Sequence, residues 1–445
     1  MRPKPDRFVL QDRQHDPKTG QVQLNYQLGD QRFTEIFFMP PGLSVSGRHQ
    51  RALDQALDAL HWIAGVSYFK AFCPGRFEAT HRRPSKQQGR WLDQIYRQGL
   101  GEFAYHHGLD PESFAHVPTD ETEVTEPAAP TLGLEQRVLL PLGGGKDSLV
   151  AWRRLADQGL SAATMTVQIG QAPLIQSLGE FMVARGDVAK HWVIARQLDP
   201  KLKHLNAQGA MNGHVPITAI NAAALTVLAI LLDAHWVVFA NERSADEPTL
   251  FDQKGRAVNH QFSKSFAFEQ LWSTWVARHI AADLKVFSIL RARTELSIAR
   301  TFAAMPEYHD EFCSCNRNFH IEPEKRTDRR WCGACPKCHF VYLVLAVWMS
   351  PAQLQAIFGQ DLLADESAID GFQALLALDG EKPFECVGQA DEARRAILAL
   401  SQSSDWQHHA VVSALAPLVE AAEVPSLDAL TAPMLPHNLP AGLAP

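Results

Sequence analysis

The sequence has no excess of positive charge: its 445 residues carry a formal net charge of −7 at pH 7. A protein that binds nucleic acid through general electrostatics carries a basic surface instead. The acidic balance therefore disfavours an RNA-modifying enzyme without eliminating one, and we expect no nucleic-acid partner.

Long hydrophobic runs are also missing. The most apolar stretch, Ala219 to Leu232, contains Asn221 and Thr226 and stops at Asp233. It is shorter than the roughly 20 residues that a bilayer requires, so it predicts a buried core helix. Residues 1–13 alternate proline and charge and show no apolar segment of a signal peptide. We therefore expect a cytoplasmic protein with no membrane partner.

Cysteine is scarce outside one segment: five of the seven cysteines lie between residues 313 and 338. This clustering indicates a metal site in a reducing compartment and argues against a disulfide framework. The CxxCxxC spacing lets three thiolates surround one ion, and a fourth ligand closes a tetrahedral zinc site. Cys315 or a histidine, His320 or His339, could replace Cys313 as that fourth ligand, and an iron–sulfur cluster or simply buried thiols are the alternatives. The predicted ligands are Cys313, Cys332, Cys335 and Cys338.

A glycine-rich turn lies between a predicted strand, Val138 to Leu142, and a predicted helix, Leu149 to Gln158. Its sequence, GGGKDS, occupies residues 143–148. Gly143, Gly144 and Gly145 allow the backbone to approach a ligand closely, and the N-terminal end of the helix adds positive potential. The segment therefore predicts an anion cradle, with an ordinary βα turn as the alternative.

Two phosphate-binding motifs resemble this turn. The P-loop pattern GxxxxGK[ST] requires a glycine at Leu140 and a hydroxyl at Asp147, so it does not fit. The SGGxDS pattern of ATP-pyrophosphatase (PP-loop) enzymes fits except that Gly143 replaces the first serine. This resemblance implies that ATP is split to AMP and pyrophosphate while a substrate is adenylylated. It also implies that Lys146 offsets phosphate charge, Ser148 donates a hydrogen bond and Asp147 holds Mg²⁺.

The order of predicted elements indicates three parts. Residues 1–116 contain a hairpin and two helical patterns, which predict a small α+β domain. Residues 117–130 are rich in proline, threonine and acidic groups and indicate a linker. Strands and helices alternate through residues 131–348, which predicts an α/β domain with a doubly wound parallel sheet. Residues 349–445 predict a helical extension with a proline-rich tail on the surface or mobile.

Polar segments follow the predicted strands, where ligands bind on doubly wound sheets. They are Asn212 to His214, Asn241 to Ser244 and Asn259 to Ser265. Their ionisable side chains are candidate ligand contacts or bases: His214, Glu242, His260 and Lys264. Farther on, Thr294 fits a helix N-cap, with a substrate contact by Arg291 or Arg293 as the alternative.

Six segments in this order resemble one family of known enzymes. They are GGGKDS (143–148), NGHVPITA (212–219), NERSA (241–245), NHQFSKS (259–265), SCN (314–316) and WCGACPKC (331–338). The set is similar to the ATP-dependent UDP-N-acetylmuramoyl-L-alanyl-L-glutamate epimerase family, MurL, over nearly the whole chain. The loop and the cysteines also resemble cyano-deazaguanine synthases of the QueC family, which are much shorter.

The MurL resemblance implies a PP-loop fold, ATP with Mg²⁺, and a pathway partner that adds L-glutamate to the muramoyl precursor. Adenylylation of the terminal α-carboxyl makes the α-proton removable by a side-chain base, and reprotonation from the other face gives D-glutamate. The candidate bases are His214, Glu242, His260, Lys264 and Cys315. A PP-loop ligase that modifies RNA or a nucleobase is one competing hypothesis, and a non-catalytic nucleotide sensor is another.

Overall fold

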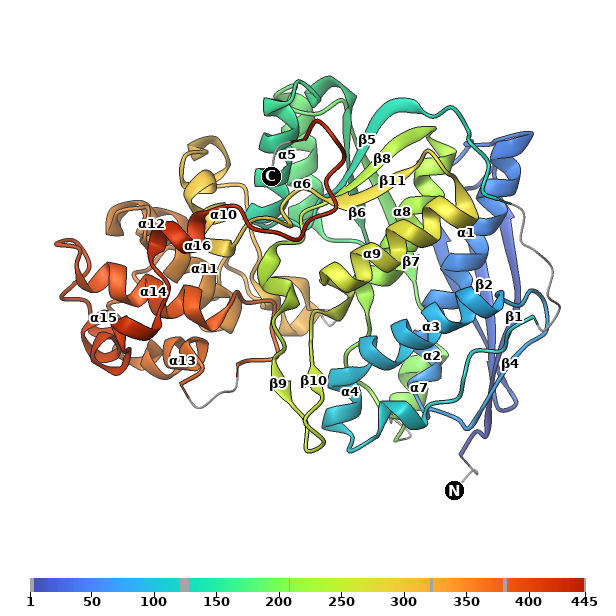
Figure 1. Ribbon diagram of the computed structural model, residues 1–445, viewed down its shortest axis with the longest axis horizontal. Helices are drawn as coiled ribbons and strands as arrows, with labels where there is room; N and C mark the ends of the chain where they lie inside the picture. Colours follow the sequence, from blue (N-terminus) through green and yellow to red (C-terminus); the bar gives the residue numbers. More distant parts are fainter. Residues whose placement is uncertain (1–3, 121–127, 208, 321–322, 379–381, 444–445) are drawn as a thin grey trace.

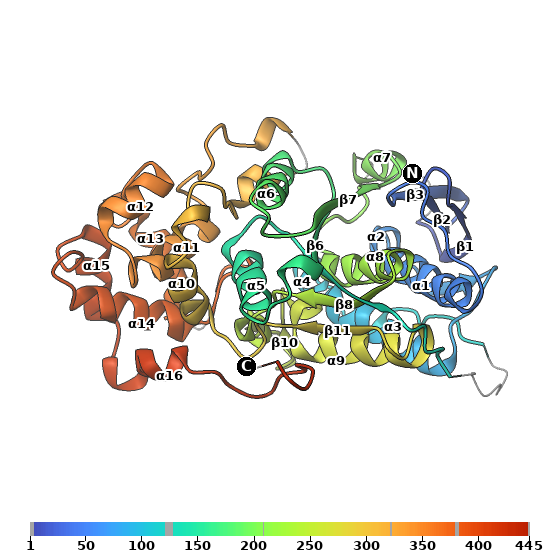
Figure 2. The ribbon, with the colours of Figure 1, turned by 90° about the horizontal axis from the view of Figure 1, so that it is seen from above.

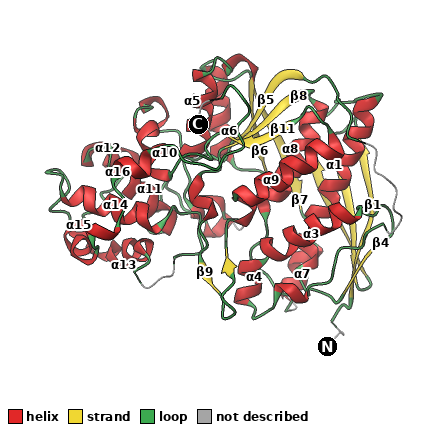
Figure 3. Ribbon diagram, in the orientation of Figure 1, coloured by secondary structure: helices red, strands yellow, loops and turns green. Residues whose placement is uncertain are grey.

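The computed structural model describes residues 4–120, 128–207, 209–320, 323–378 and 382–443, and one nine-stranded sheet dominates the N-terminal two-thirds (Figures 1 and 3). The strand order is β11-β8-β5-β6-β7-β3-β2-β1-β4. The strands are β1 (Arg7–Asp16), β2 (Gln21–Leu28), β3 (Gln31–Phe38), β4 (Arg76–Ala79), β5 (Glu135–Pro141), β6 (Thr164–Ile169), β7 (Lys190–Gln197), β8 (Ala234–Phe239) and β11 (Lys285–Ser288). A separate short hairpin pairs β9 (Leu250–Phe251) with β10 (Ala257–Val258).

The described residues also form many helices. The α-helices are α1 (Arg48–Ala64), α2 (Val66–Phe69), α3 (Lys86–Gly99), α4 (Gly101–His106), α5 (Lys146–Asp157), α6 (Pro173–Ala184), α7 (Lys201–Ala207), α8 (Ile217–Leu231), α9 (Phe266–Trp275), α10 (Glu295–Ala303), α11 (Pro336–Ala346), α12 (Pro351–Phe358), α13 (Ile369–Gln373), α14 (Ala390–Ser401), α15 (Ala410–Leu415) and α16 (Leu427–Thr431). The protein is therefore α/β with a large, mostly parallel sheet, as the alternating pattern predicts.

The sheet joins the two N-terminal parts that the sequence separates at residue 116. Strands β11, β8, β5, β6 and β7 are parallel, and β3 then pairs with β7 in the antiparallel sense. At this seam Arg196 Nε donates to Glu35 Oε1 at 2.6 Å, and the Glu35 side chain is fully buried. Part of the predicted linker, residues 121–127, lies outside the described residues.

Two hydrophobic cores cover the two faces of the sheet. Leu139 of β5 packs into the core that contains α1 and α8, whereas Val138 and Leu140 pack into the core with α5 and α10. Side chains alternate along a strand, so a strand buried on both faces is apolar at every position. Figure 2 shows α5 and α6 on one side of the parallel strands and α8 on the other.

The C-terminal helices gather at one end of the molecule, far from β1 and β4 (Figures 1 and 2). The predicted surface tail is partly packed, because α16 buries Leu430 and the Met434 N–H donates to the Ala292 carbonyl at 3.0 Å. No single helix of the described chain is long and apolar enough to cross a membrane. In the described chain, one bent pair of helical segments, 410–418 and 421–431, reaches the length and apolar composition of a membrane span when the two are taken together. This agreement concerns length and composition alone.

Candidate functional site

The glycine loop, Gly143 to Gly145, connects β5 to α5 at the carboxyl edge of the parallel strands. Gly144 has φ +83°, and a Cβ there would lie 2.9 Å from the carbonyl oxygen of Cys313. The Cys313 N–H also donates to the Gly144 carbonyl at 2.8 Å. Only glycine fits this position without strain, and the loop is packed against the segment that leads into the cysteine cluster.

One cavity of about 360 Å³ lies directly over this loop. The residues after β5 and β8 contribute to its wall, as expected for a ligand site on such a sheet. Residues from β6 and α6, from α8 and from the segments around residues 264, 314–319, 337 and 386 complete the wall. Its ionisable and thiol side chains are Asp147, Glu242, Lys264, Lys337 and Cys386.

Three carboxyl groups, two of them in the cavity wall, lie close together and could hold a divalent cation. One oxygen each of Asp147, Glu242 and Glu295 lies within 4.8 Å of the others, and oxygen ligands are those that Mg²⁺ prefers. Burial, with the charge of Asp147, raises the pKa of both Glu242 and Glu295. A cation would remove that mutual repulsion, so these residues fit the predicted Mg²⁺.

Lys146, which is predicted to offset phosphate charge, is paired with two carboxylates of the site. Its ammonium is buried and bonds to Asp147 at 2.5 Å and to Glu295. It therefore lies among the carboxylates and balances their charge in this state.

The four-thiol cluster contains Cys315 in place of the predicted Cys313. The sulfurs of Cys315, Cys332, Cys335 and Cys338 lie within 4.8 Å of one another, with 3.4 Å from Cys335 to Cys338 and 3.7 Å from Cys332 to Cys338. A tetrahedral zinc with bonds of about 2.3 Å places its sulfurs about 3.8 Å apart, so the cluster fits zinc. The assignment of Cys313 as a ligand is thus wrong, since its thiol donates to the Arg330 carbonyl at 2.9 Å. Cys315 is correspondingly engaged in the cluster and is not free to act as a base.

The cysteine segment also shapes the cavity wall. Ser314 and Asn316 flank Cys315, and Lys337 lies between two cluster cysteines; all three line the cavity. Lys337 Nζ donates to the carbonyl of Cys386, and Asn316 donates to Glu385. The cluster therefore holds residues that contact both the glycine loop and the 385–386 segment.

The predicted bases separate into two neighbouring groups. Glu242 and Lys264 line the cavity, whereas His214 and His260 lie beside it with Glu102 of α4. His260 Nδ1 lies 2.5 Å from Glu102, and the two imidazole centroids are 4.6 Å apart. Burial lowers the pKa of His214 to about 4. Despite burial, bonds to Cys386 and Glu102 raise the pKa of His260 to about 9.

Arg291 and Thr294 have structural roles. The Thr294 hydroxyl caps α10 by accepting from the Ser297 N–H, which confirms the N-cap prediction. Arg291 is buried, donates to Glu269 at 3.0 Å and donates to the Glu242 carbonyl at 2.8 Å. It therefore fixes the backbone that presents Glu242.

Sequence reasoning missed four groups of the site: Glu102, Glu295, Lys337 and Cys386. Lys337 lies inside the quoted WCGACPKC segment, and Cys386 is one of two cysteines outside the cluster region, so both carried a signal. Glu102 and Glu295 carried no such sequence signal, because only the packing of α4 and α10 brings them close to the other site residues.

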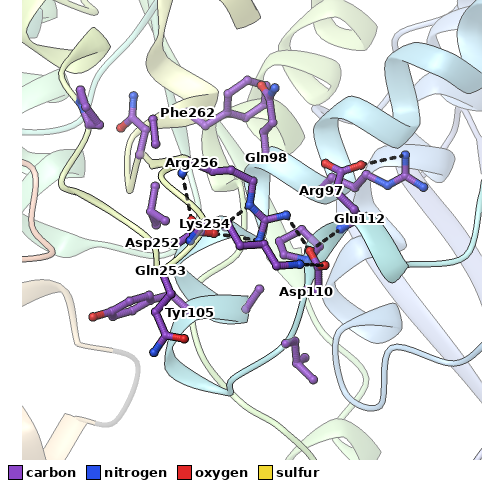
Figure 4. Close-up of a pocket in the computed structure, with 18 of the residues that line it drawn as sticks. Arg97, Gln98, Tyr105, Asp110, Glu112, Asp252, Gln253, Lys254, Arg256 and Phe262 are labelled. Atoms are coloured by element: carbon purple, nitrogen blue, oxygen red, sulfur yellow. Dashed lines mark hydrogen bonds and ion pairs between the residues drawn. The ribbon is translucent and has the colours of Figure 1, made fainter.

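A larger cavity of about 760 Å³ lies between α4 and the β9–β10 hairpin (Figure 4). Its basic side chains are neutralised by neighbours: Lys254 and Arg256 both bond to Asp110, and Arg256 also bonds to Asp252. The smaller cavity is the stronger candidate site, because its wall holds the glycine loop and two of the three clustered carboxylates.

Fold and site together define an α/β protein in which a glycine-rich loop and a carboxylate cluster lie beside a cluster of four cysteine thiols. Residues 1–289 match the MurL N-terminal domain and residues 311–429 match the MurL C-terminal domain. The chain therefore belongs to the MurL family.

Three relatives are named UDP-N-acetyl-alpha-D-muramoyl-L-alanyl-L-glutamate epimerase. The one from Xanthomonas oryzae pv. oryzae is 42% identical over 89% of this chain and 86% of its own length. The Micromonospora relative is 36% identical over 98% and 96%, and the Salinispora tropica relative is 38% identical over 92% and 88%. The similarity thus extends over most of each protein.

Proposed function

We propose that this protein epimerises the terminal L-glutamate of UDP-N-acetylmuramoyl-L-alanyl-L-glutamate to D-glutamate, with ATP split to AMP and pyrophosphate. The observation that carries the proposal is the single cavity in which the glycine loop and the carboxylates Asp147 and Glu242 face Lys264 and Cys386. A substrate bound in this cavity can therefore be activated by ATP and lose its α-proton at the same place. The names of the relatives supply the substrate.

Activation solves a specific chemical difficulty. An α-proton next to a free carboxylate is hard to remove, because the resulting dianion has no place for its second charge. Adenylylation of the α-carboxyl removes the first charge and makes the carbonyl an electron sink, so that a side-chain base can take the proton. Hydrolysis of the adenylate then gives the D-glutamate product and AMP.

The residues of the cavity divide this work. The backbone of residues 143–145, the Ser148 hydroxyl and the N-terminal end of α5 bind the phosphates. Asp147, Glu242 and Glu295 hold Mg²⁺, which offsets phosphate charge when bound. Cys315 and its three partners hold a structural zinc. This arrangement is the one expected of a PP-loop domain.

The proposed substrate also indicates the cellular compartment of the enzyme and the reaction that precedes it. UDP-linked muramoyl peptides are peptidoglycan precursors, so we place the protein in the cytoplasm beside a ligase that adds L-glutamate to the muramoyl precursor. We also propose that the chain is divided into an N-terminal domain (residues 1–116), an ATP-binding domain (131–348) and a helical C-terminal extension (349–445).

The test is substrate-dependent AMP formation. Purified protein with ATP and Mg²⁺ is given the muramoyl dipeptide, a tRNA mixture or a deazaguanine base. The dipeptide product is hydrolysed, and the configuration of its glutamate is determined on a chiral column. We expect AMP and D-glutamate with the dipeptide alone. AMP formed only with tRNA or the base would replace this proposal with a PP-loop ligase, and no AMP with any of them would favour a nucleotide sensor.

A further inference from the structure

Cys386 lies in the segment between α13 and α14, outside the tetrathiolate cluster, and it lines the same cavity as the glycine loop. Its position is fixed from three sides. Lys337 donates to its carbonyl, Asn316 donates to the preceding Glu385, and the Val387 N–H donates to the Glu385 carbonyl at 2.8 Å. The thiol is thus held against the cavity by residues of the cysteine segment.

The Cys386 sulfur is a hydrogen-bond acceptor in this setting. Lys264 Nζ donates to it at 3.2 Å, and His260, itself held by Glu102, bonds to it as well. Burial opposes ionisation, but Lys264, the His260 bond and Lys337 together lower the pKa of the thiol to about 6. Cys386 is therefore a thiolate at neutral pH, paired with two cations.

The charges of its neighbours decide which group of the cavity can accept a proton. Despite burial, Cys386 and Glu242 raise the pKa of Lys264, so this lysine stays protonated. His260, with a pKa near 9, is also protonated at neutral pH. Both are proton donors in the resting protein. Asp147 and Glu242 are carboxylates of the cation cluster, which leaves the Cys386 thiolate as the base that the cluster does not engage.

We propose that the Cys386 thiolate, held by Lys264 and His260, is the base on one face of the glutamyl α-carbon. This inference rests on the proposed epimerase function. The Cα–H bond breaks, its proton forms an S–H bond with Cys386, and its electron pair moves into the adjacent acyl carbonyl. A solvent-derived proton delivered to the opposite face restores the C–H bond with inverted configuration, and the thiol returns its proton to solvent. Lys264 and His260 are positioning residues that keep the sulfur ionised.

The first test compares Cys386→Ser with Cys73→Ser. Cys73 is the matched control because it lies outside both the cluster and the cavity, and burial raises the pKa of its thiol to about 12. We expect Cys386→Ser to lower D-product formation at least about 100-fold, the lower end of what a general base contributes. Pyrophosphate release from the L-substrate in a single turnover should stay within about tenfold of wild type, because adenylylation, which expels pyrophosphate, precedes proton removal. Zinc content and melting temperature establish that the variant is folded.

A second readout needs no turnover. The zinc-loaded protein is treated with iodoacetamide between pH 5 and 9, and labelled peptides are mapped by mass spectrometry. We expect Cys386 to react with an inflection near pH 6, and Lys264→Gln to move the inflection upward. The charged groups that act on the thiol are Lys264, His260 and Lys337. The acidic groups around them are Glu242 and Asp147 near Lys264, and Glu102 and Glu385 near His260. Loss of the Lys264 cation therefore raises the pKa of the thiol. Epimerisation should fall below the same pH as the thiolate becomes protonated.

The outcomes separate the two claims. Wild-type D-product formation by Cys386→Ser, or no labelling of Cys386 below pH 8, overturns the thiolate base and leaves the epimerase function standing. A wild-type protein that forms neither AMP nor D-glutamate from the dipeptide overturns both.

Discussion

At the scale of single residues, two cysteines separated by one residue, Cys313 and Cys315, have different environments. Cys315 Sγ meets three other thiols, whereas Cys313 Sγ is engaged by the Arg330 carbonyl and by Asn318. The CxCxnCxxCxxC pattern contains both, and spacing alone does not choose between them. The choice follows from the path of the chain, because the Cys313 backbone is tied to Gly144.

This difference gives a direct prediction for zinc content. We expect one zinc per chain in wild type and in Cys313→Ser, and loss of the zinc with a lower melting temperature in Cys315→Ser, since metal binding stabilises the folded state. Metal analysis of freshly purified, reduced protein measures this. Zinc retained by Cys315→Ser and lost from Cys313→Ser would reverse the assignment.

At the scale of elements, the glycine loop is shaped by its contact with the cysteine segment. Gly144 and Gly159 both have positive φ, +83° and +74°, but a Cβ at Gly159 would meet nothing within 4 Å. We expect either glycine-to-alanine change to cost about 1–2 kcal/mol of folding stability, because an L-residue is strained there. Only Gly144→Ala should also weaken binding of an ATP analogue, because its Cβ would press on the Cys313 carbonyl.

Calorimetric titration of both variants and thermal melts separate the two effects. Equal nucleotide affinity in wild type and Gly144→Ala would show that the loop is not the phosphate cradle. Gly159→Ala serves as the control for backbone strain alone.

The sequence predicted the elements that carry the parallel sheet, because buried strands are apolar runs and the helices between them are amphipathic or, like α8, apolar and buried. The glycine loop and the cysteines were identified for the same kind of reason, since their chemistry depends on local spacing. Strands β1 and β4 were not predicted; β4 is only four residues long, and its pairing with β1 comes from distant sequence. Glu102, Glu295 and Cys386 reach the site only through such long-range packing.

At the scale of the whole molecule, the N-terminal residues belong to the same framework as the site. Glu102 of α4 holds His260, and Lys70 donates to Asn212 and to the Gly213 carbonyl, both at 2.9 Å. From the other end of the chain, buried Glu392 of α14 accepts from the Ser244 hydroxyl at 2.9 Å. Residues of all three parts that the sequence suggests therefore hold the segments that line or flank the cavity.

The seam between β3 and β7 tests this integration. We expect Arg196→Ala to lower the free energy of unfolding by about 3–5 kcal/mol, because it leaves the fully buried Glu35 carboxylate without its partner. Arg76→Ala is the matched control: it breaks the exposed ion pair with Asp6 and should cost less than about 1 kcal/mol. Denaturant unfolding measures both changes. A loss below about 1 kcal/mol for Arg196→Ala would show that the two halves of the sheet are not joined there.

The measurement that tests the central claim most directly is isotope incorporation from solvent. The protein is incubated in heavy water with UDP-N-acetylmuramoyl-L-alanyl-L-glutamate, ATP and Mg²⁺, and the product is analysed by mass spectrometry and chiral chromatography. If activation serves to remove the α-proton, deuterium must appear at the glutamate α-carbon of the D product, AMP must accumulate with it, and omission of ATP must stop both. AMP formed from this substrate with no deuterium at the α-carbon and no D-glutamate would contradict the epimerase account and leave only carboxyl activation.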